Sequence, residues 1–577
     1  MQLIRLYANK ESFNTIDFNP SGITIILAKT HKQRRQDDKN TYNGLGKSMI
    51  IHLVNFCLGS NKIEELETKL PGWEFSLDFI VNNKKYSVTR ATDKQNNIIL
   101  NGKPESLKKY RSILAEDIFR LSEYENIQYL TFRTLLSRFI RPSKISYTDY
   151  LICDKGDQKN DYQKYINPCY LIGLEPAILN KKFKLKTELD KQSNAKKFLE
   201  EDETFNEFFH SSQNLPELKQ DIDKLESDLN NINIAENYYK EMEKVESLNT
   251  KLSNIDNQIF ILTKQIFNLE KTLSLKIDLP QEKLFNIYEE AKVNFGVSLT
   301  KTIDEVYNFK TSLIKERFER LQADKHKLNL KLEDLLDRRS KTGVERDSML
   351  KYLTAHKALD EYSFLNDKLN KLKIKYEKLS SAKKLFNEYT NQILNYEKEL
   401  ADENIKAQKY LLEVEDVLEQ SKLLFSQLSN EFYNKPGKLD ISNDTGNNKI
   451  RYKINTYIDF DSSDGINAMK IFCFDILLLL NQRNHNMNCI FHDSRLFGNT
   501  DTKQLSILFA QVQQLFNGTN NQYICTLNEN TLRELKTEMN EEDYSNVILK
   551  NVCRTVLTDE SSTTKLLGIE VKMNLDK

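Results

Sequence analysis

The chain has few of the residues that mark loop-rich, disulfide-stapled or membrane-spanning proteins. Its 577 residues include only 16 glycines, 9 prolines and one tryptophan. The seven cysteines form no C-x-x-C pair, and none lies between residues 170 and 472. No apolar run approaches the roughly 20 residues of a membrane span, and the N-terminus shows no signal-peptide pattern. These absences argue against a disulfide framework and a membrane protein, and they predict reduced thiols in the cytoplasm.

The chain also lacks an excess of charge of either sign. It has 84 Lys and Arg residues against 84 Asp and Glu residues, so its formal net charge is zero. The overall charge therefore neither favours nor excludes a nucleic-acid partner, and only local basic patches could do so. Charged residues still make up 29% of the chain. With so little glycine, this content favours long, charged helices in a protein of several domains.

A glycine loop stands between a predicted strand and a predicted helix near the N-terminus. The strand is Ile23–Leu27, the helix is Met49–Phe56, and the loop reads Thr41-Tyr42-Asn43-Gly44-Leu45-Gly46-Lys47-Ser48. This order is the context of a phosphate-binding P-loop, in which backbone N–H groups and the helix N-terminus face the phosphates. Thr41 stands where the P-loop pattern has its first glycine, and an ordinary glycine loop is the alternative.

Each residue of the loop has an expected role if it holds a nucleoside triphosphate. Asn43, Gly44 and Gly46 would line the phosphates with their backbone N–H groups. Lys47 would reach the β- and γ-phosphates, and Ser48 would ligate Mg²⁺.

Long heptad-like seams occupy the middle of the chain, with apolar residues spaced alternately three and four apart. A continuous helix over the first seam would be about 90 Å long and would need a partner. Two seams around the break at residues 278–305 predict an antiparallel coiled-coil hairpin, and two separate dimerising coils are the alternative. Without a cysteine in this region, its apex cannot be a cysteine zinc hook. The seam residues are Leu215, Leu218, Ile222, Leu225, Leu229 and Ile232, then Val245, Leu248, Leu252, Ile255, Ile259, Leu262, Ile266, Leu269 and Leu273, and finally Tyr362, Leu365, Leu369, Leu372, Tyr376 and Leu379.

The two ends of the chain read as α/β halves of one head. We expect an N-terminal half at 1–180, an ascending arm at 181–277, an apex at 278–305, a descending arm at 306–432 and a C-terminal half at 433–577. Within the halves, Asn82-Asn83 predicts a hairpin between two strands, and Leu566–Met573 predicts a closing strand.

Two basic stretches are candidate DNA contacts. Residues Tyr129–Arg141 predict an amphipathic basic helix that carries Arg133, Arg138 and Arg141. The alternatives for this helix are pairing with acidic residues of the head or contact with a protein partner. The other stretch is the polar insert before the glycine loop, for which a solvated loop is the alternative; it contains Lys29, Lys32, Arg34 and Arg35.

A P-loop half, a coiled-coil hairpin and a C-terminal α/β half together resemble the SMC-like branch of the ABC ATPases. The chain is most similar to the SMC-like subunit of Lamassu and ABC-three-component antiphage systems. The residues that carry this closer resemblance are Phe132-Arg133-Thr134-Leu135-Leu136, Phe472-Cys473-Phe474-Asp475, His492-Asp493-Ser494-Arg495-Leu496-Phe497 and Thr526-Leu527-Asn528-Glu529. The resemblance implies an α/β ABC-type ATPase head that is formed by the N- and C-terminal segments and split by the hairpin.

The resemblance also implies roles for residues of the C-terminal half. Asp493 ends an apolar strand and would hold Mg²⁺ in the Walker B role, although Ser494 replaces the glutamate that usually orients water. The alternatives are that Asp493 is itself the water-positioning residue, with His492 in the preceding slot, or that Asp493 only caps a turn. A serine is a poor base, so hydrolysis should be slow.

Further family positions fall on isolated polar residues. Ser463 and Gly465 resemble a degenerate signature that touches the γ-phosphate bound to a second head, and a plain helix cap is the alternative. Gln128 is a candidate Q-loop residue, although exposed glutamines are common, and Asp501 fits the D-loop position. No histidine follows the strand Gln522–Leu527 at the switch position.

The sequence thus predicts an SMC-like ATPase that binds ATP and Mg²⁺ and dimerises through its heads. The resemblance implies DNA handling and a defence complex with bridging subunits and an effector subunit such as a nuclease. A DNA-repair ATPase and an ATP-binding scaffold with little turnover are the alternatives.

Overall fold

The computed structural model describes residues 1–29, 45–201, 215–230, 236–274, 303–353, 358–459, 463–498, 500–573 and 575. The chain divides into two compact units. The head unit comprises Met1–Lys186, Pro280–Val306 and Leu400–Lys577, and the arm unit comprises Thr187–Leu279 and Tyr307–Glu399. The C-terminal part of the head unit thus begins at Leu400, earlier in the chain than the expected boundary at residue 433. Most of the expected apex lies outside the described residues.

An antiparallel sheet in the head unit is made only from the N-terminal segment. Its strand order is β2-β1-β4-β5-β6-β7. The Asn82-Asn83 turn joins β4 to β5 with φ of 48° and 61°, as the sequence predicts for a hairpin of this type. The strands are β1 (Gln2–Ala8), β2 (Ile16–Asp17), β4 (Glu74–Val81), β5 (Lys84–Ala91), β6 (Asn97–Leu100) and β7 (Lys103–Ser106).

A parallel sheet joins the two ends of the chain. Its order is β10-β11-β3-β12, and β3 (Gly22–Lys29) is the one strand from the N-terminal segment. Strand β11 (Gln522–Asn528) pairs with β3 over its whole length, from Gln522 opposite Gly22 to Asn528 opposite Ala28. The flanking strands are β10 (Cys489–His492) and β12 (Leu557–Thr558). Because β3 is buried on both faces, the core of the head requires both ends of the chain.

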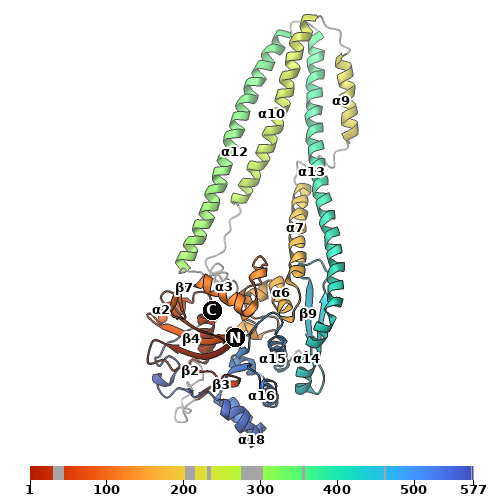
Figure 1. Ribbon diagram of the computed structural model, residues 1–577. Helices are drawn as coiled ribbons and strands as arrows, with labels where there is room; N and C mark the ends of the chain where they lie inside the picture. Colours follow the sequence, from red (N-terminus) through yellow and green to blue (C-terminus); the bar gives the residue numbers. More distant parts are fainter. Residues whose placement is uncertain are drawn as a thin grey trace. The chain divides into compact units, whose positions relative to one another are not determined.

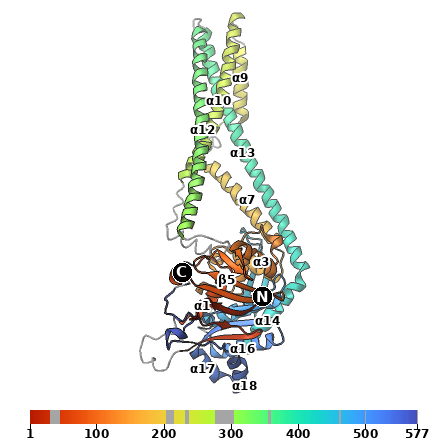
Figure 2. The ribbon, with the colours of Figure 1, turned by 60° about the vertical axis from the view of Figure 1, so that its left-hand side comes forward.

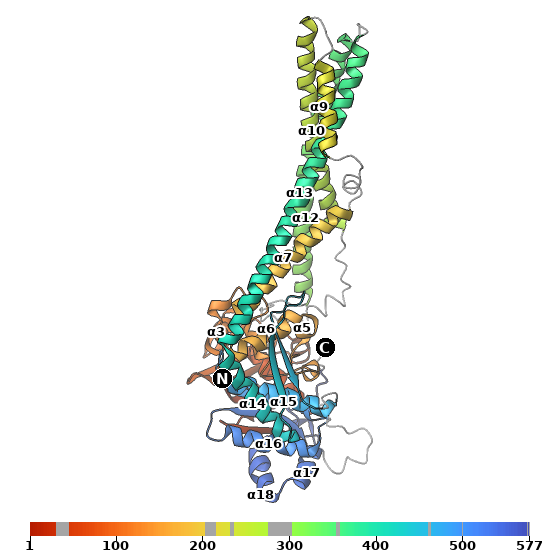
Figure 3. The same cartoon turned by 90° about the vertical axis from the view of Figure 1, so that its right-hand side faces the viewer.

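Helices cover these sheets, and a hairpin of β8 (Lys438–Asn443) and β9 (Tyr452–Tyr457) forms a separate pair. Helices α14, α15 and α16 lie close together in the head (Figure 3). The helices of the head are α1 (Lys47–Cys57), α2 (Glu64–Lys69), α3 (Leu107–Phe119), α4 (Phe132–Leu136), α5 (Lys155–Lys159), α6 (Asp161–Ile172), α14 (Glu415–Tyr433), α15 (Asp464–Asn481), α16 (Thr502–Phe516), α17 (Glu529–Glu538) and α18 (Glu541–Asp543).

The arm unit is an antiparallel coiled coil. Asp256 pairs with Arg339 and Glu270 pairs with Lys325, so α10 and α12 run in opposite directions. The first seam also packs on the second, because Ile222, Leu225 and Leu229 form one apolar cluster with Leu369. The helices that form the arm are α7 (Pro176–Glu201), which begins in the head unit, α9 (Leu215–Asn230), α10 (Glu236–Ser274), α12 (Ile303–Leu353) and α13 (Ala358–Glu413), which ends in the head unit (Figure 1).

The first seam is not one continuous helix. Residues 215–273 belong to two elements, α9 and α10. Within the arm unit, Figure 2 shows α9 at the same level as the first part of α10, so these segments overlap instead of following one another. Ile232 and Val245 are 13 residues apart, one fewer than two heptads, and this change of seam phase is a signal of the break in the sequence. An α/β head built from both ends of the chain and split by an inserted antiparallel coiled coil is the fold class of the protein, as the sequence predicts.

Two elements expected in the head differ. The basic helix predicted over Tyr129–Arg141 is only the short α4, Phe132–Leu136. Residues Leu566–Met573 form turns and irregular backbone rather than a closing strand. The reason for the first difference is burial, because the apolar and basic side chains of this stretch both enter the core instead of lying on opposite faces.

Candidate nucleotide-binding site

The site lies where three neighbouring parallel strands end. In an α/β sheet, ligands bind outside the carboxyl ends of such strands. Asp493 follows β10, Asn528 ends β11, and the segment that leads to Lys47 follows β3. Since β11 lies between β10 and β3, the three residues come from consecutive strands of one sheet.

The described part of the glycine loop has the geometry of a helix start without a side-chain cap. Gly46 is the N-cap of α1 with φ of 102° and ψ of 4°, a conformation that favours glycine. Among the described residues, no side chain caps α1 and no acidic residue stands in its first turn, so the positive end of the helix dipole would favour an anion. Thr41, Tyr42, Asn43 and Gly44 lie outside the described residues. Ser48 is the second residue of α1 and is partly exposed.

Lys47 turns inward to the ends of the strands. Its side chain is 8% exposed, and its Nζ donates a hydrogen bond to the side-chain oxygen of Asn528. Burial lowers the pKa of Lys47 to about 8, against the opposing attraction of the Asp493 carboxylate. A buried ammonium beside a carboxylate gains from a further anion such as a phosphate.

Asp493 carries one oxygen that is not hydrogen-bonded. Its Oδ1 accepts from Ser494 Oγ at 3.1 Å and from the N–H of Arg495 at 3.2 Å, so it caps the short helix Ser494–Phe497. Its Oδ2 is buried and has no hydrogen-bond partner. A buried carboxylate oxygen is costly without a partner, and a divalent cation is a suitable one. The donor set therefore fits Mg²⁺, with one carboxylate and the Ser48 hydroxyl as protein ligands.

The described residues hold no cluster of three or more His, Cys, Asp or Glu side chains that could bind a metal. Magnesium sites in phosphate-binding proteins need only one or two protein ligands, because phosphate oxygens and water complete the octahedron.

A buried network holds the end of β10 in place. The N–H of Asp493 donates to Tyr147 Oη at 2.7 Å, and that hydroxyl donates to the carbonyl of Arg141 at 2.7 Å. The guanidinium of Arg141 makes two 2.6 Å hydrogen bonds to Asp475 on α15. The backbone next to Asp493 is thus tied to a fully buried ion pair.

His492 points into this network. Its Nε2 lies 2.9 Å from Asp475 Oδ2, and its Nδ1 lies 3.2 Å from Tyr523 Oη. Burial lowers the pKa of His492, so the ring is neutral near pH 7. Burial alone would raise the pKa of Asp475, but Arg141 and His492 hold it below its usual value. With both ring nitrogens engaged, His492 is a poor metal ligand compared with Asp493.

Of the other expected site residues, Ser463, Asp501 and Gln128 are exposed and Gly465 is partly exposed. Ser463 is at the N-cap position of α15, where its hydroxyl makes no capping bond, and Gly465 is the second residue of that helix. Asp501 caps α16, accepting from the N–H of Lys503 at 2.8 Å. Gln128 is exposed in the turn before α4. The side chain of Asp501 caps its helix, whereas the side chain of Ser463 makes no capping hydrogen bond.

The three arginines of the expected basic helix are buried, which overturns their role as a DNA patch. Arg133, Arg138 and Arg141 are 2%, 0% and 0% exposed. Arg133 donates to the carbonyl of Leu58 at 3.1 Å and to the Asn55 side chain. The alternative reading, in which these arginines pair within the head, is confirmed for Arg138 and Arg141.

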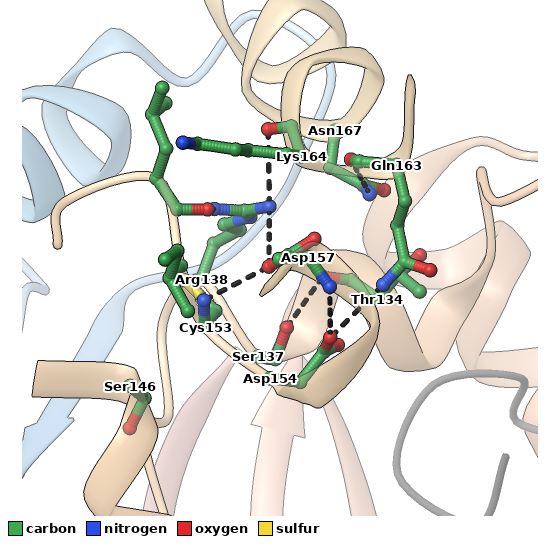
Figure 4. A network of polar contacts seen from close by, with 12 residues as sticks. Thr134, Ser137, Arg138, Ser146, Cys153, Asp154, Asp157, Gln163, Lys164 and Asn167 are labelled. Atoms are coloured by element: carbon green, nitrogen blue, oxygen red, sulfur yellow. Dashed lines mark hydrogen bonds and ion pairs between the residues drawn. The ribbon is translucent and has the colours of Figure 1, made fainter. Parts of the chain in front are cut away.

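Arg138 belongs to a second buried network, shown in Figure 4. It pairs with Asp157 at 2.8 Å, and Asp157 also accepts from the N–H of Cys153 at 2.9 Å. Asp154 accepts from the N–H of Asp157 and from Gln163 at 2.9 and 3.0 Å. Burial, and then repulsion by Asp157, raises the pKa of Asp154 to about 8. These charges organise the interior of the head and are not available to a ligand outside it.

Sequence reasoning missed two residues of the site. Asn528 occupies the position after the apolar strand where a histidine was sought, and its amide binds Lys47 instead. Tyr147 supports Asp493 from a segment with no motif of its own. The first could have been found by asking which polar residue ends β11, and the second had no signal in the sequence.

Comparisons with known proteins bear on the fold and on the C-terminal half. Residues 428–571 match a family described as "Uncharacterised protein conserved in bacteria (DUF2326)". No curated protein matches the chain significantly. In the part of the chain that is described, no helix is long and apolar enough to cross a membrane. All seven cysteines are buried and free.

Two solved structures are similar to the chain over most of its length. One is the Smc head domain with a coiled coil and joint from Pyrococcus yayanosii, at 14% identity, 93% coverage of this chain, 94% coverage of that chain and a TM-score of 0.33. The other is the Smc head domain with an extended coiled coil bound to the C-terminal domain of ScpA from Pyrococcus furiosus. It has 11% identity, 93% coverage of this chain, 91% coverage of that chain and a TM-score of 0.32. These values do not support a transfer of function, so we infer function from the residues of the site.

Proposed function

We propose that the protein is an SMC-like ATPase that binds ATP and Mg²⁺ at the ends of β3, β11 and β10. The observation that carries the proposal is Lys47, which follows an uncapped glycine start of α1 and lies buried against Asn528 near a carboxylate with an open oxygen. Burial lowers the pKa of Lys47, so its charged form at this place would gain from the negative charge of a bound phosphate.

Residues of the site would divide the work as follows. Asn43, Gly44 and Gly46 offer backbone N–H groups to the phosphates, and Lys47 and Ser48 act on the β- and γ-phosphates and on Mg²⁺. Asp493 holds the metal through Oδ2. Asn528, set beside Lys47, can sense the γ-phosphate with its side-chain amide. Gln128 and Asp501 would complete the site from exposed loops.

Hydrolysis should be slow, because no acidic side chain follows Asp493. Ser494 donates its hydroxyl to Asp493 and its N–H to Thr526, so it is not placed to take a proton from water. Bound metal would supply charge stabilisation on the phosphates. The same observation favours a second candidate function, an ATP-binding scaffold whose turnover is negligible.

A second copy of the chain would complete each site through Ser463 and Gly465. The exposed and uncapped N-terminus of α15 suits a phosphate presented by another head. Ser463→Arg should therefore abolish ATP-dependent crosslinking between heads while nucleotide binding survives. Ser106→Arg, which puts the same side chain at the exposed N-cap of α3, is the control for a general effect of an arginine at a helix start. Unchanged ATP-dependent dimerisation of Ser463→Arg would reduce this stretch to a helix start.

DNA remains a proposed partner, but through a different surface from the buried arginines. Of the basic insert, Lys29 is exposed and Lys32, Arg34 and Arg35 lie outside the described residues. Reversal of these four charges should weaken DNA binding and reduce its salt dependence. Bridging and effector subunits of a defence complex are the partners that the family resemblance suggests, and co-purification of co-expressed neighbours tests them.

One experiment decides the central proposal. Binding of a fluorescent ATP analogue and ATP hydrolysis, each with and without DNA, should be measured on the full chain and on Lys47→Ala. We expect Lys47→Ala to lose binding, because the phosphates lose their main cation, whereas the exposed Lys69→Ala binds like the wild type. Equal binding by folded Lys47→Ala would remove the nucleotide site. Binding without hydrolysis would select the scaffold.

A further inference from the structure

The C-terminal segment returns to the glycine loop after β12. Leu566 donates its N–H to the carbonyl of Leu45 at 3.2 Å. It also packs so closely on the next residue that a Cβ on Gly46 would lie 2.5 Å from Leu566 Cβ. Leu566 is 1% exposed and Leu45 is 2% exposed, so this contact is part of the core.

The same segment is held from its other side by the loop between β1 and β2. Asn14 donates its backbone N–H to the carbonyl of Leu566 at 2.9 Å. Its side-chain amide donates to the carbonyls of Thr563 and Lys565 at 2.8 and 2.6 Å. Ser12 Oγ donates to the carbonyl of Leu567 at 2.9 Å. A short piece of chain is therefore fastened between the loop that contains Asn14 and the residues that start α1.

The start of α1 needs such support, because its own residues supply little. Gly46 has the greatest conformational freedom of any residue type, and no side chain caps the helix. A phosphate site made from backbone N–H groups works only if these groups are already in position, since ordering them on binding costs affinity. Contact from Leu566 on Gly46 and Leu45 limits the conformations open to the loop.

We propose that residues 562–568 act as a strap that holds the glycine loop in its phosphate-binding conformation, with Asn14 and Leu566 as positioning residues. This inference rests on the proposed nucleotide site and adds to it a requirement for the C-terminal end of the chain. The strap supports binding, because Leu566 contacts Leu45 and Gly46 at the start of α1.

The first test needs no nucleotide. Hydrogen exchange is measured on the full-length wild type, on Asn14→Ala and on Asn9→Ala. Asn9 is a matched control on the same loop: its side chain bonds to Gly72 and Glu74 at 3.1 and 2.9 Å, on the side of β4. Amides of residues 45–51 should exchange about tenfold faster in Asn14→Ala, the scale expected for one or two lost hydrogen bonds. Equal exchange in all three proteins overturns the strap, whether or not the protein binds ATP.

The second test is the affinity for a fluorescent ATP analogue. We expect Asn14→Ala and Leu566→Ala to bind about tenfold more weakly than the wild type, because fewer molecules have the loop in the competent conformation. Asn9→Ala should bind normally, and fluorescence of Trp73 should show that the heads of all variants are folded. Unchanged or tighter binding by Asn14→Ala refutes the positioning role. Absence of binding by the wild type refutes the proposed function instead and leaves the exchange result to decide the strap.

Discussion

The head and the arm use the same charged residues for different purposes. In the head, Arg138 and Arg141 pair with Asp157 and Asp475 at 0–1% side-chain exposure. In the arm, pairs such as Arg338–Asp334 are more than half exposed on both sides. A buried pair fixes neighbouring segments and cannot lose one partner without leaving a charge in the core. An exposed pair one helical turn apart contributes little beyond solubility.

This difference between buried and exposed ion pairs shows that an arginine in an amphipathic stretch does not by itself identify a nucleic-acid surface. Arg141 satisfies three backbone carbonyls besides Asp475, those of Ser146, Tyr150 and Ile152. A guanidinium can do this because it has five N–H donors in a fixed plane. In the head, therefore, arginine organises loops that have no secondary structure of their own.

The largest effect should come from breaking the Arg141 pair. Arg141→Ala leaves Asp475 buried without its main partner, and we expect the free energy of unfolding of the head to fall by about 3–5 kcal/mol. Urea denaturation followed by the fluorescence of Trp73 measures this free energy, because the single tryptophan is 6% exposed and belongs to the head. A loss below about 1 kcal/mol would show that the network behind Asp493 is not structural.

A second prediction separates two carboxylates of the Figure 4 network. Asp157→Asn should destabilise the head by about 3 kcal/mol at any pH between 5 and 8, because Arg138 loses its ion pair. Asp154→Asn should be tolerated, because the amide resembles the protonated acid.

The pKa of Asp154 sets the direction in which the stability of the head changes with pH. Its pKa is about 8 in the folded protein and 3.8 ordinarily, so between these values the folded state binds a proton that the unfolded state has released. Its contribution to stability is present below about pH 4 and is lost as the pH rises to 8. Asp154→Asn should remove this loss and gain at least about 1 kcal/mol relative to the wild type at pH 8. A stability curve parallel to that of the wild type would contradict it.

A third prediction concerns Lys47, the residue that the proposed function assigns to the phosphates. Its pKa is lowered to about 8, and phosphate binds the protonated form. Nucleotide affinity should therefore fall by up to about tenfold per pH unit above 8, until the pKa of the complex is reached. Lys182 is the matched control, because its pKa is also lowered to about 8 but its Nζ bonds to the carbonyl of Asp444. Lys182→Met should leave the pH profile of affinity unchanged, and a profile that Lys182→Met flattens would exclude Lys47 as its cause.

The smallest effect is expected in the arm. Arg338→Ala removes an exposed pair and should change the stability of the coiled coil by no more than about 0.5 kcal/mol, measured by thermal melting with circular dichroism. A larger loss would show that this surface is covered in the protein as it works. The contrast between the buried ion pairs of the head and the exposed ion pairs of the arm would then not hold for this pair.

Local patterns predicted most of the elements well. The strand β3, the helix α1, the hairpin at Asn82-Asn83 and the helix α16 follow from periodicity and turn residues that act over short distances. The seam residues predicted the antiparallel coiled coil for the same reason. The seam from Leu215 to Leu273 does not form the continuous helix whose length was considered, because it is divided between α9 and α10.

The residues of the site could be predicted only in part. Lys47 and Asp493 each follow an apolar strand, which is visible in the sequence, and the parallel sheet places them at one edge. Asn528 gave a weaker signal, because a terminal asparagine after a strand is common. Tyr147 and Asn14 gave none, since their roles come from contacts with residues hundreds of positions away.

The sequence predicted which segments are strands, helices and coiled coil, because these depend on neighbours along the chain, and phosphate binding by the glycine loop stays a prediction. The buried charges, the Asp493 oxygen without a hydrogen-bond partner and the segment that lies on Gly46 became visible only in the folded head. Burial depends on what packs over a residue, and in this head the packing partners come from opposite ends of the chain. The same arginine or leucine therefore reads alike in the sequence, whether it faces water or holds the core together.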